Sequence, residues 1–402
     1  MNVRSRTTIA LLVVGAAFPV GPLAAQGSLG LWDATPGPLV AQMRAGIEDY
    51  YAFDYTGALA RFDQVIAAVP DHPVGYFLKA EAYWWLFLND RQNARARREL
   101  DRWLEEAIAR GERRLEGRPD DVETLFIVGS AYGRRGMLAG TAKDAWNAAR
   151  DAQRAKGKLD RIRELAPGNV DAIAAKGLYE YYVGTFGSVT RAASRLLFGL
   201  HGDRAAGLEA LDTARREGTY TRTEAGFFQG LFYLQFEDRP AAAQPILDRL
   251  RERYPENLYF TTMAAYARQR QRRFDAARAM YESVLQQLDG TRVYGREGES
   301  ITRLLYGQTL MALGGYDAAT SQFVRVVQLR ALESDAYPHA YLFLGRLADL
   351  QGNRPMAETY YRRVLSLPDA AGSRDAAERY LKRPFAEREI PALVGGSTAA
   401  AR

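Results

Sequence analysis

Residues 341–364 read YLFLGRLADLQGNRPMAETYYRRV, and this stretch decides the fold. Small and large residues recur at helical spacing on both sides of a Gly-Asn-Arg-Pro turn at 352–355. Gly345 leaves room for a close neighbour on the first side, while Ala357 and Tyr361 supply a gap and a ring on the second. A glycine after a helix and a polar residue before the next one are the usual stop and start signals. The stretch therefore predicts two antiparallel helices that pack closely.

The same order of residues recurs towards the N-terminus. One unit earlier it comprises Leu304, Gly307, Ala319, Phe323 and Val326, and before that Ala265, Phe274, Ala277, Tyr281 and Val284. A further good unit comprises Gly46, Tyr55, Ala58, Phe62 and Pro70. Strand-type alternation is absent. A helix pair of this kind cannot bury its apolar face alone, so consecutive pairs are expected to stack into one continuous core.

On these residues the chain resembles the tetratricopeptide-repeat (TPR) family, whose unit is a helix–turn–helix of about 34 residues. The resemblance implies an all-α fold, a right-handed α-solenoid of about eight units over residues 39–370, stretched in 73–219. A capping helix is expected at 371–385, because solenoid ends need a more polar outer face. Residues 26–38 and 386–402 are interpreted as flexible segments.

Residues 1–25 have the pattern of a secretory signal peptide. Arg4 and Arg6 precede a short apolar run at 9–20, and Leu23-Ala24-Ala25 offers a cleavage site before Gln26. The run is shorter than the roughly 20 residues that span a bilayer. The sequence therefore predicts an exported protein, periplasmic or in the cell envelope, and a retained N-terminal anchor is the alternative.

Composition narrows the chemistry. Among 402 residues there is no cysteine, and the only histidines are His72, His201 and His339, at no metal-ligand spacing. No phosphate loop or nucleophile motif occurs, so we expect no catalytic residues, no metal and no cofactor. The formal charge of +6 is carried mostly by arginines interspersed with acids. Basic runs are short, such as Gln269–Arg273, which predicts that nucleic acid is not a partner.

An insertion at 183–204 departs from the repeat. Residues 189–197 have helical apolar spacing, and a Gly-Asp at 202–203 starts another helix. Residues 177–211 faintly resemble a segment of the inclusion-body-clearance branch of repeat proteins, which implies a non-enzymatic protein. We expect a core-filling helix; a lid or a helix that touches a membrane is the alternative.

The resemblance also implies a partner site, because first helices line a concave groove in TPR proteins. Residues carried over to groove positions are rich in aromatic and amide side chains, which suit recognition. The expected partner is a protein or an extended peptide, although Phe77 and Trp84 have an alternative role, packing against a neighbouring helix. The expected contact residues are Phe77, Trp84, Tyr181, Tyr259, Tyr266, Gln269, Gln308 and Arg346.

Three functions compete at this point. The leading hypothesis is a non-enzymatic, exported TPR scaffold that binds a protein segment in its groove. The second is a structural subunit of an envelope export or cell-wall assembly. The third is an enzyme or ligand sensor within residues 73–219, which requires a deep pocket of titratable groups near Tyr179, Tyr181 and His201.

Overall fold

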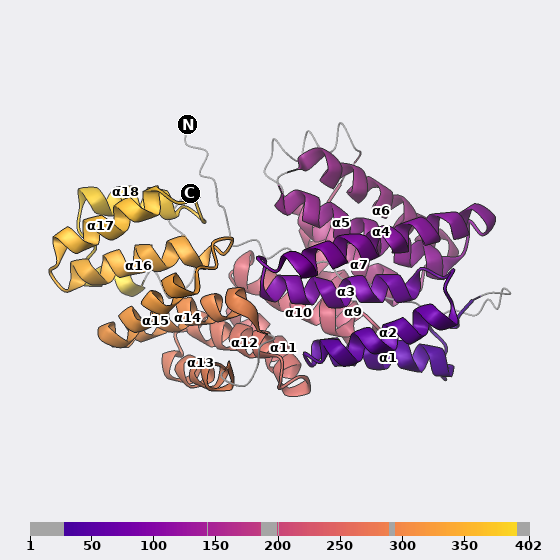
Figure 1. The fold of residues 1–402 in the computed structure, drawn as a ribbon, viewed down its shortest axis with the longest axis horizontal. Helices are drawn as coiled ribbons and strands as arrows, with labels where there is room; N and C mark the ends of the chain where they lie inside the picture. The colour runs from indigo at the N-terminus through magenta and orange to yellow at the C-terminus, as the bar shows by residue number, and fades with distance from the viewer. Residues whose placement is uncertain (1–27, 143, 186–198, 200, 289–293, 392–402) are drawn as a thin grey trace. The chain divides into compact units, whose positions relative to one another are not determined.

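The computed structural model describes residues 28–142, 144–185, 199, 201–288 and 294–391 (Figure 1). These ranges contain α-helices, one 3-10 turn and no strand, so the all-α expectation is confirmed. The chain divides into two compact units. The N-terminal unit contains residues 28–85 and 95–229, and the C-terminal unit contains residues 86–94 and 230–391.

Helices of the N-terminal unit follow one another as antiparallel pairs, coloured indigo to pink in Figure 1. The pairs α1/α2, α5/α6 and α7/α9 each pack along their length. The last residues of α3 and most of the second half of α10 belong to the C-terminal unit. The helices are α1 (Pro38–Tyr51), α2 (Tyr55–Ala68), α3 (Val74–Asn89), α4 (Ala94–Gly117), α5 (Val122–Thr141), α6 (Ala145–Leu165), α7 (Val170–Gly184), α9 (Arg204–Glu217) and α10 (Arg222–Gln235).

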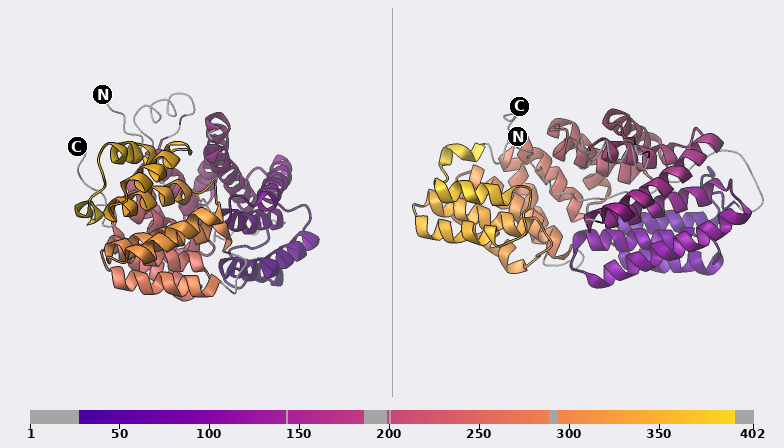
Figure 2. Two further views of the ribbon diagram at one scale, coloured as in Figure 1. Left: turned by 60° about the vertical axis from the view of Figure 1, so that its left-hand side comes forward. Right: turned by 90° about the horizontal axis from the view of Figure 1, so that it is seen from above.

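The C-terminal unit continues the same scheme, as Figure 2 shows from two further directions. Each helix packs on the next from α11 to α18. The helices are α11 (Pro240–Arg253), α12 (Leu258–Arg270), α13 (Phe274–Leu288), α14 (Gly295–Ala312), α15 (Tyr316–Leu329), α16 (Ala336–Leu350), α17 (Arg354–Leu365), α18 (Ser373–Lys382) and a 3-10 turn at Glu387–Glu389.

The small and large residues singled out in the sequence meet inside each pair. A Cβ atom placed on Gly307 would lie 2.5 Å from Cε1 of Phe323, and one on Gly46 would lie 2.5 Å from Cε1 of Phe62. Gly345 faces the ring of Tyr361 in the same way. These glycines are therefore required because the aromatic ring of the second helix occupies the space of a side chain.

The turns between paired helices use left-handed backbone. Gly314 has φ +77° and Gly352 has φ +73°, a region that costs a glycine little and other residues more. After Gly352 the side chain of Asn353 accepts a hydrogen bond from the Met356 amide at 3.2 Å and caps α17. The turn residues of the deciding stretch thus act as the sequence predicted.

The middle helices of the N-terminal unit are long. Helix α4 has 24 residues, α5 has 20 and α6 has 21, against 14 in α1 and in α2. Helix α4 remains strongly amphipathic over its whole length, so its added turns bury a continuous apolar stripe. The buried residues of that stripe are Ala96, Leu100, Leu104, Ala107, Ile108, Gly111 and Leu115.

Both terminal segments correct an expectation. Residues 28–33 were expected to be flexible, yet Leu31 is fully buried and the segment is hydrogen-bonded to Glu123 of α5. At the other end, Ile390 is buried and Glu387 accepts a hydrogen bond from the Tyr316 hydroxyl at 3.0 Å. The free energy gained from these hydrogen bonds and buried apolar side chains exceeds the entropic cost of ordering a few residues. The proposed signal peptide, residues 1–25, lies outside the described residues.

Candidate functional site

The expected contact residues of the N-terminal unit lie inside it. Phe77, Trp84 and Tyr181 are each at most 2% exposed. The indole of Trp84 lies against the guanidinium of Arg134, 4.6 Å from its carbon to the ring centroid. The burial of Phe77 and Trp84 thus fits the alternative role, in which they pack against neighbouring helices.

A buried ionic cluster occupies the same region. Arg134 of α5 is fully buried and donates from Nε to Glu81 of α3 at 2.9 Å and from Nη2 to Glu224 of α10 at 3.3 Å. A second hydrogen bond joins Nη2 to Glu81. Burial raises the pKa of Glu81, and the charge of Arg134 opposes this rise. The cluster therefore links α3, α5 and α10, each the first helix of a repeat unit. It lies where the family pattern predicted a partner-binding groove.

The sequence reasoning missed Arg134 and Glu224. Glu81 is the single acid in the apolar run at 76–88. A lone acid on such a helix signals a buried cation elsewhere in the fold, because an unpaired buried carboxylate is costly. Nothing in the sequence indicates which arginine supplies the charge.

In the C-terminal unit the expected contact residues split into two groups. Tyr259, Gln269 and Arg346 are at most 5% exposed, whereas Tyr266 and Gln308 are half-buried. Gln269 of α12 donates from Nε2 to Oε1 of Gln308 of α14 at 3.0 Å. The Oε1 atom of Gln269 accepts from the Tyr281 hydroxyl at 2.8 Å, which sets the orientation of its amide. Tyr266 and Gln308 are therefore the two of the eight residues that keep access to solvent.

Arg346 is enclosed by aromatic rings. Its guanidinium carbon lies 4.6 Å from the ring centroid of Phe343, 5.2 Å from that of Tyr380 and 5.6 Å from that of Phe385. Burial lowers the pKa of Arg346. Cation–π contacts of this kind stabilise a desolvated arginine. Arg346 thus joins α16 to the C-terminal cap, which consists of α18 and the residues that follow it, 383–391.

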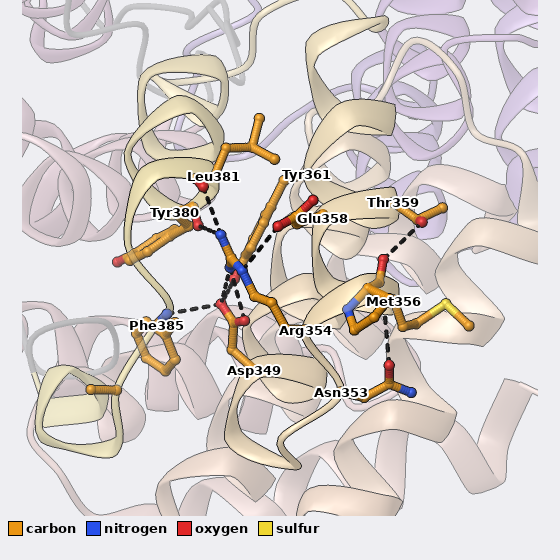
Figure 3. Close-up of polar contacts among 12 residues, drawn as sticks. Asp349, Asn353, Arg354, Met356, Glu358, Thr359, Tyr361, Tyr380, Leu381 and Phe385 are labelled. Atoms are coloured by element: carbon orange, nitrogen blue, oxygen red, sulfur yellow. Dashed lines mark hydrogen bonds and ion pairs between the residues drawn. The ribbon is translucent and has the colours of Figure 1, made fainter.

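Figure 3 shows how that cap is held. Asp349 at the end of α16 accepts from Arg354 at 3.0 Å, from the Tyr361 hydroxyl at 2.8 Å and from the Phe385 amide at 2.8 Å. Arg354 also donates to the carbonyl oxygens of Tyr380 and Leu381 at 2.8 and 2.7 Å. Those carbonyls end α18, where a cation is favourable. Asp349 and Arg354 therefore close the C-terminal end of the repeat.

A cavity of about 120 Å³ lies in the region required by the ligand-sensor hypothesis. Burial raises the pKa of Tyr179 to about 12, and its hydroxyl accepts a hydrogen bond from the His201 amide at 3.2 Å. Ligand pockets for drug-sized molecules or cofactors usually have 300–1,000 Å³, so this cavity fits only a small molecule or ion. It is lined by Lys156, Leu159, Asp160, Arg163, Lys176, Tyr179, Glu180 and His201.

The described parts of the chain offer neither a metal site nor a membrane-spanning helix. There, no group of three or more His, Asp and Glu side chains could hold a metal ion. Within the same residues no helix is both long enough and apolar enough to cross a bilayer. Most of the 183–204 insertion, residues 186–198 and 200, lies outside the described ranges, so its core-filling and lid interpretations stay predictions.

No family model and no curated protein matches this sequence. Solved structures do match its fold. A monomeric IFIT1 mutant with m7Gppp-AAAA has a TM-score of 0.51 at 15% identity, over 84% of this chain and 71% of that one. The human IFIT1 dimer with m7Gppp-AAAA has a TM-score of 0.50 at 14% identity, over 88% and 82% of the chains. A tetratricopeptide repeat protein from Parabacteroides merdae has a TM-score of 0.31 at 14% identity, over 85% and 98%.

The two IFIT1 structures show that this chain has an all-α helical-repeat solenoid fold of the TPR type. The expectation that nucleic acid is not a partner is wrong as an exclusion, because the IFIT1 structures that share the fold hold capped RNA. Scattered arginines and short basic runs were too weak a ground for excluding RNA, since a helical-repeat scaffold can assemble a binding surface from residues distant in sequence.

Proposed function

We propose that this chain is an exported, non-enzymatic TPR scaffold that binds a protein segment on the faces of α12 and α14 that carry Tyr266 and Gln308. The observation that carries the proposal is the linked amide pair. Gln308 uses Oε1 to accept from Gln269, and its Nε2 atom makes no hydrogen bond within the described residues. A fixed amide with an unused donor can bind a main-chain carbonyl, and the ring of Tyr266 on α12 can bury an apolar side chain.

Export is supported by the charged, apolar and small-residue regions at 1–25. The absence of a nucleophile motif in the sequence supports a non-enzymatic role. If export is correct, mass spectrometry of protein recovered from the envelope gives an N-terminal peptide that starts at Gln26. A chain that retains Met1 there would favour an anchored form instead.

Photo-crosslinking tests the binding face. A benzoylphenylalanine at position 308 is expected to capture one stoichiometric protein from envelope extract, and the same probe at Met356, which is 44% exposed on α17, captures none. Tyr266→Ala combined with Gln308→Ala should abolish co-purification of that protein without loss of helical content. Co-purification of a multi-protein complex that survives the double substitution would favour the structural-subunit hypothesis.

A ligand sensor is the second candidate, and the cavity beside Tyr179 and His201 is the observation that favours it. Lys156, Arg163 and Lys176 stand there with Asp160 and Glu180, which suits a small zwitterion. A set of free amino acids screened by thermal shift provides the test. A concentration-dependent rise in melting temperature that disappears in Tyr179→Phe would support the sensor, and no shift at millimolar ligand would reject it.

A further inference from the structure

The N-terminal strap, residues 28–33, is held as peptides are held by receptors. Glu123 receives three donors from it: the Ser28 hydroxyl at 2.7 Å, the Leu29 amide at 2.8 Å and the Leu31 amide at 3.1 Å. Glu123 is 4% exposed, and burial raises its pKa. A buried carboxylate needs such donors. The strap therefore satisfies a polar group that is 92 to 95 positions away in sequence.

A second wall binds the carbonyl side of the strap. The carbonyl oxygen of Leu31 accepts from the Tyr220 hydroxyl at 2.7 Å and from Nη2 of Arg44 at 3.0 Å. Arg44 also donates from Nε to the Tyr220 hydroxyl at 3.1 Å, so the two side chains orient each other. The amide and the carbonyl of Leu31 are thus both recognised, and main-chain recognition of this kind accepts a segment whichever chain supplies it.

The second wall is itself fixed from behind. Asp171 of α7 accepts hydrogen bonds from the amides of residues 219–221 and from the Thr221 hydroxyl, the last at 2.6 Å. These contacts hold Tyr220 in place by groups that do not belong to the strap. The acceptor site, defined as Arg44, Glu123 and Tyr220, is therefore built by α1, α5 and the loop that leads into α10.

The strap contributes two apolar side chains and a tight turn. Leu31 is fully buried and Trp32 is 7% exposed. Gly30 has φ +64°, and its carbonyl oxygen accepts from the Asp33 amide at 3.0 Å. The strap is thus a short, preformed ligand with its own internal hydrogen bond.

The link from the strap to the first helix is weak. Residues 34–36 form no hydrogen bond within the described chain, and Ala34 and Thr35 are exposed. Pro36 precedes Gly37, and α1 begins at Pro38. Domain swapping occurs when a segment with its own set of contacts is joined to the rest of the chain by a short, exposed connection.

We propose that the acceptor site is a peptide-binding site that can accept residues 28–33 from a second copy of this chain. The strap would make the same contacts whether it binds its own chain or a second chain. The contact energies of the two arrangements are therefore equal and favour neither. The tethered strap has an effective concentration in the millimolar range, which keeps the isolated protein monomeric at low concentration. Exchange becomes visible when a chain's own strap cannot bind. The inference does not depend on the proposed envelope partner.

Two complementary full-length variants test the exchange. Leu31→Asp disables the strap, because a second carboxylate cannot be buried beside Glu123, and leaves the acceptor site intact. Glu123→Gln combined with Tyr220→Phe disables the acceptor site and leaves the strap intact. Each variant alone is expected to have the mass of one chain by light scattering, and an equimolar mixture at tens of micromolar is expected to form a complex of two chains.

Controls separate strap exchange from other association. The peptide QGSLGLWDAT, residues 26–35, should bind the Leu31→Asp variant in titration calorimetry. It should also dissociate the mixed complex by occupying the acceptor site. A mixture in which both partners carry Leu31→Asp should stay monomeric. Absence of a complex in the crossed mixture, or a complex that persists in the control mixture, overturns the proposal. Loss of helical content in Leu31→Asp alone also overturns it, because the strap would then be an inseparable part of the core.

Discussion

Replacing Arg134 by methionine removes the cation that pairs with two buried carboxylates, Glu81 and Glu224. Glu81 and Glu224 are 2% and 3% exposed, so neither recovers hydration when its partner is lost. Breaking a buried ion pair from one side costs about 3–5 kcal/mol. For a unit of this size, 1 kcal/mol corresponds to about 2–4 °C, so the melting temperature of the N-terminal unit should fall by about 6–20 °C.

The loss should depend on pH in a defined direction. Burial raises the pKa of Glu81, so the folded state binds a proton more readily than the unfolded chain does. Stability is then highest at low pH and is lost as the pH rises above the ordinary value of a glutamate, about 4.3. Without Arg134 nothing opposes this rise. Arg134→Met should therefore be closest to wild type near pH 4 and furthest from it at pH 7.

Thermal unfolding followed by circular dichroism from pH 4 to 8 measures both effects. Adding Glu81→Gln to Arg134→Met should restore part of the loss at pH 7, because one buried charge is removed. The control is Arg97→Met, whose side chain pairs with Asp101 at 2.8 Å and is 36% exposed; this change should alter stability by no more than about 1 kcal/mol. An equal fall in melting temperature in Arg134→Met and Arg97→Met would refute the conclusion that Arg134 neutralises buried carboxylates. So would the absence of rescue by Glu81→Gln.

Three further predictions concern the helix pairs and the loop behind the acceptor site. Tyr361→Ala should cost about 3–5 kcal/mol and loosen mainly α16 to α18 in hydrogen exchange, and loosening spread evenly over the chain would contradict this. Gly307→Ala should destabilise by about 1–3 kcal/mol in chemical denaturation because its Cβ meets Phe323, whereas Gly157→Ala on α6, with nothing within 4 Å, should be neutral or stabilising. Burial raises the pKa of Asp171 to about 6, so wild type gains stability as the pH falls from 6 to 4; Asp171→Asn should lack that gain, and parallel pH profiles of melting temperature would disprove it.

The amino-acid sequence by itself determined the helix pairs. Gly307 and Phe323, like Gly345 and Tyr361, are 16 residues apart and meet across one short turn. Contacts at this range follow from helical periodicity and side-chain size, which can be seen along the chain. The sequence also indicated the turn glycine Gly352, because its position after an apolar run is a usual stop signal for a helix, and its backbone is left-handed.

Only the tertiary structure decided which of the proposed contact residues are accessible and what holds the chain's ends. Arg134 reaches Glu81 and Glu224 across 53 and 90 positions, and Ser28 reaches Glu123 across 95. The partner of a buried charge depends on how successive helix pairs are rotated, and no local pattern encodes that rotation. For the same reason the family pattern could point to Trp84 as a groove residue, although the fold encloses it against Arg134.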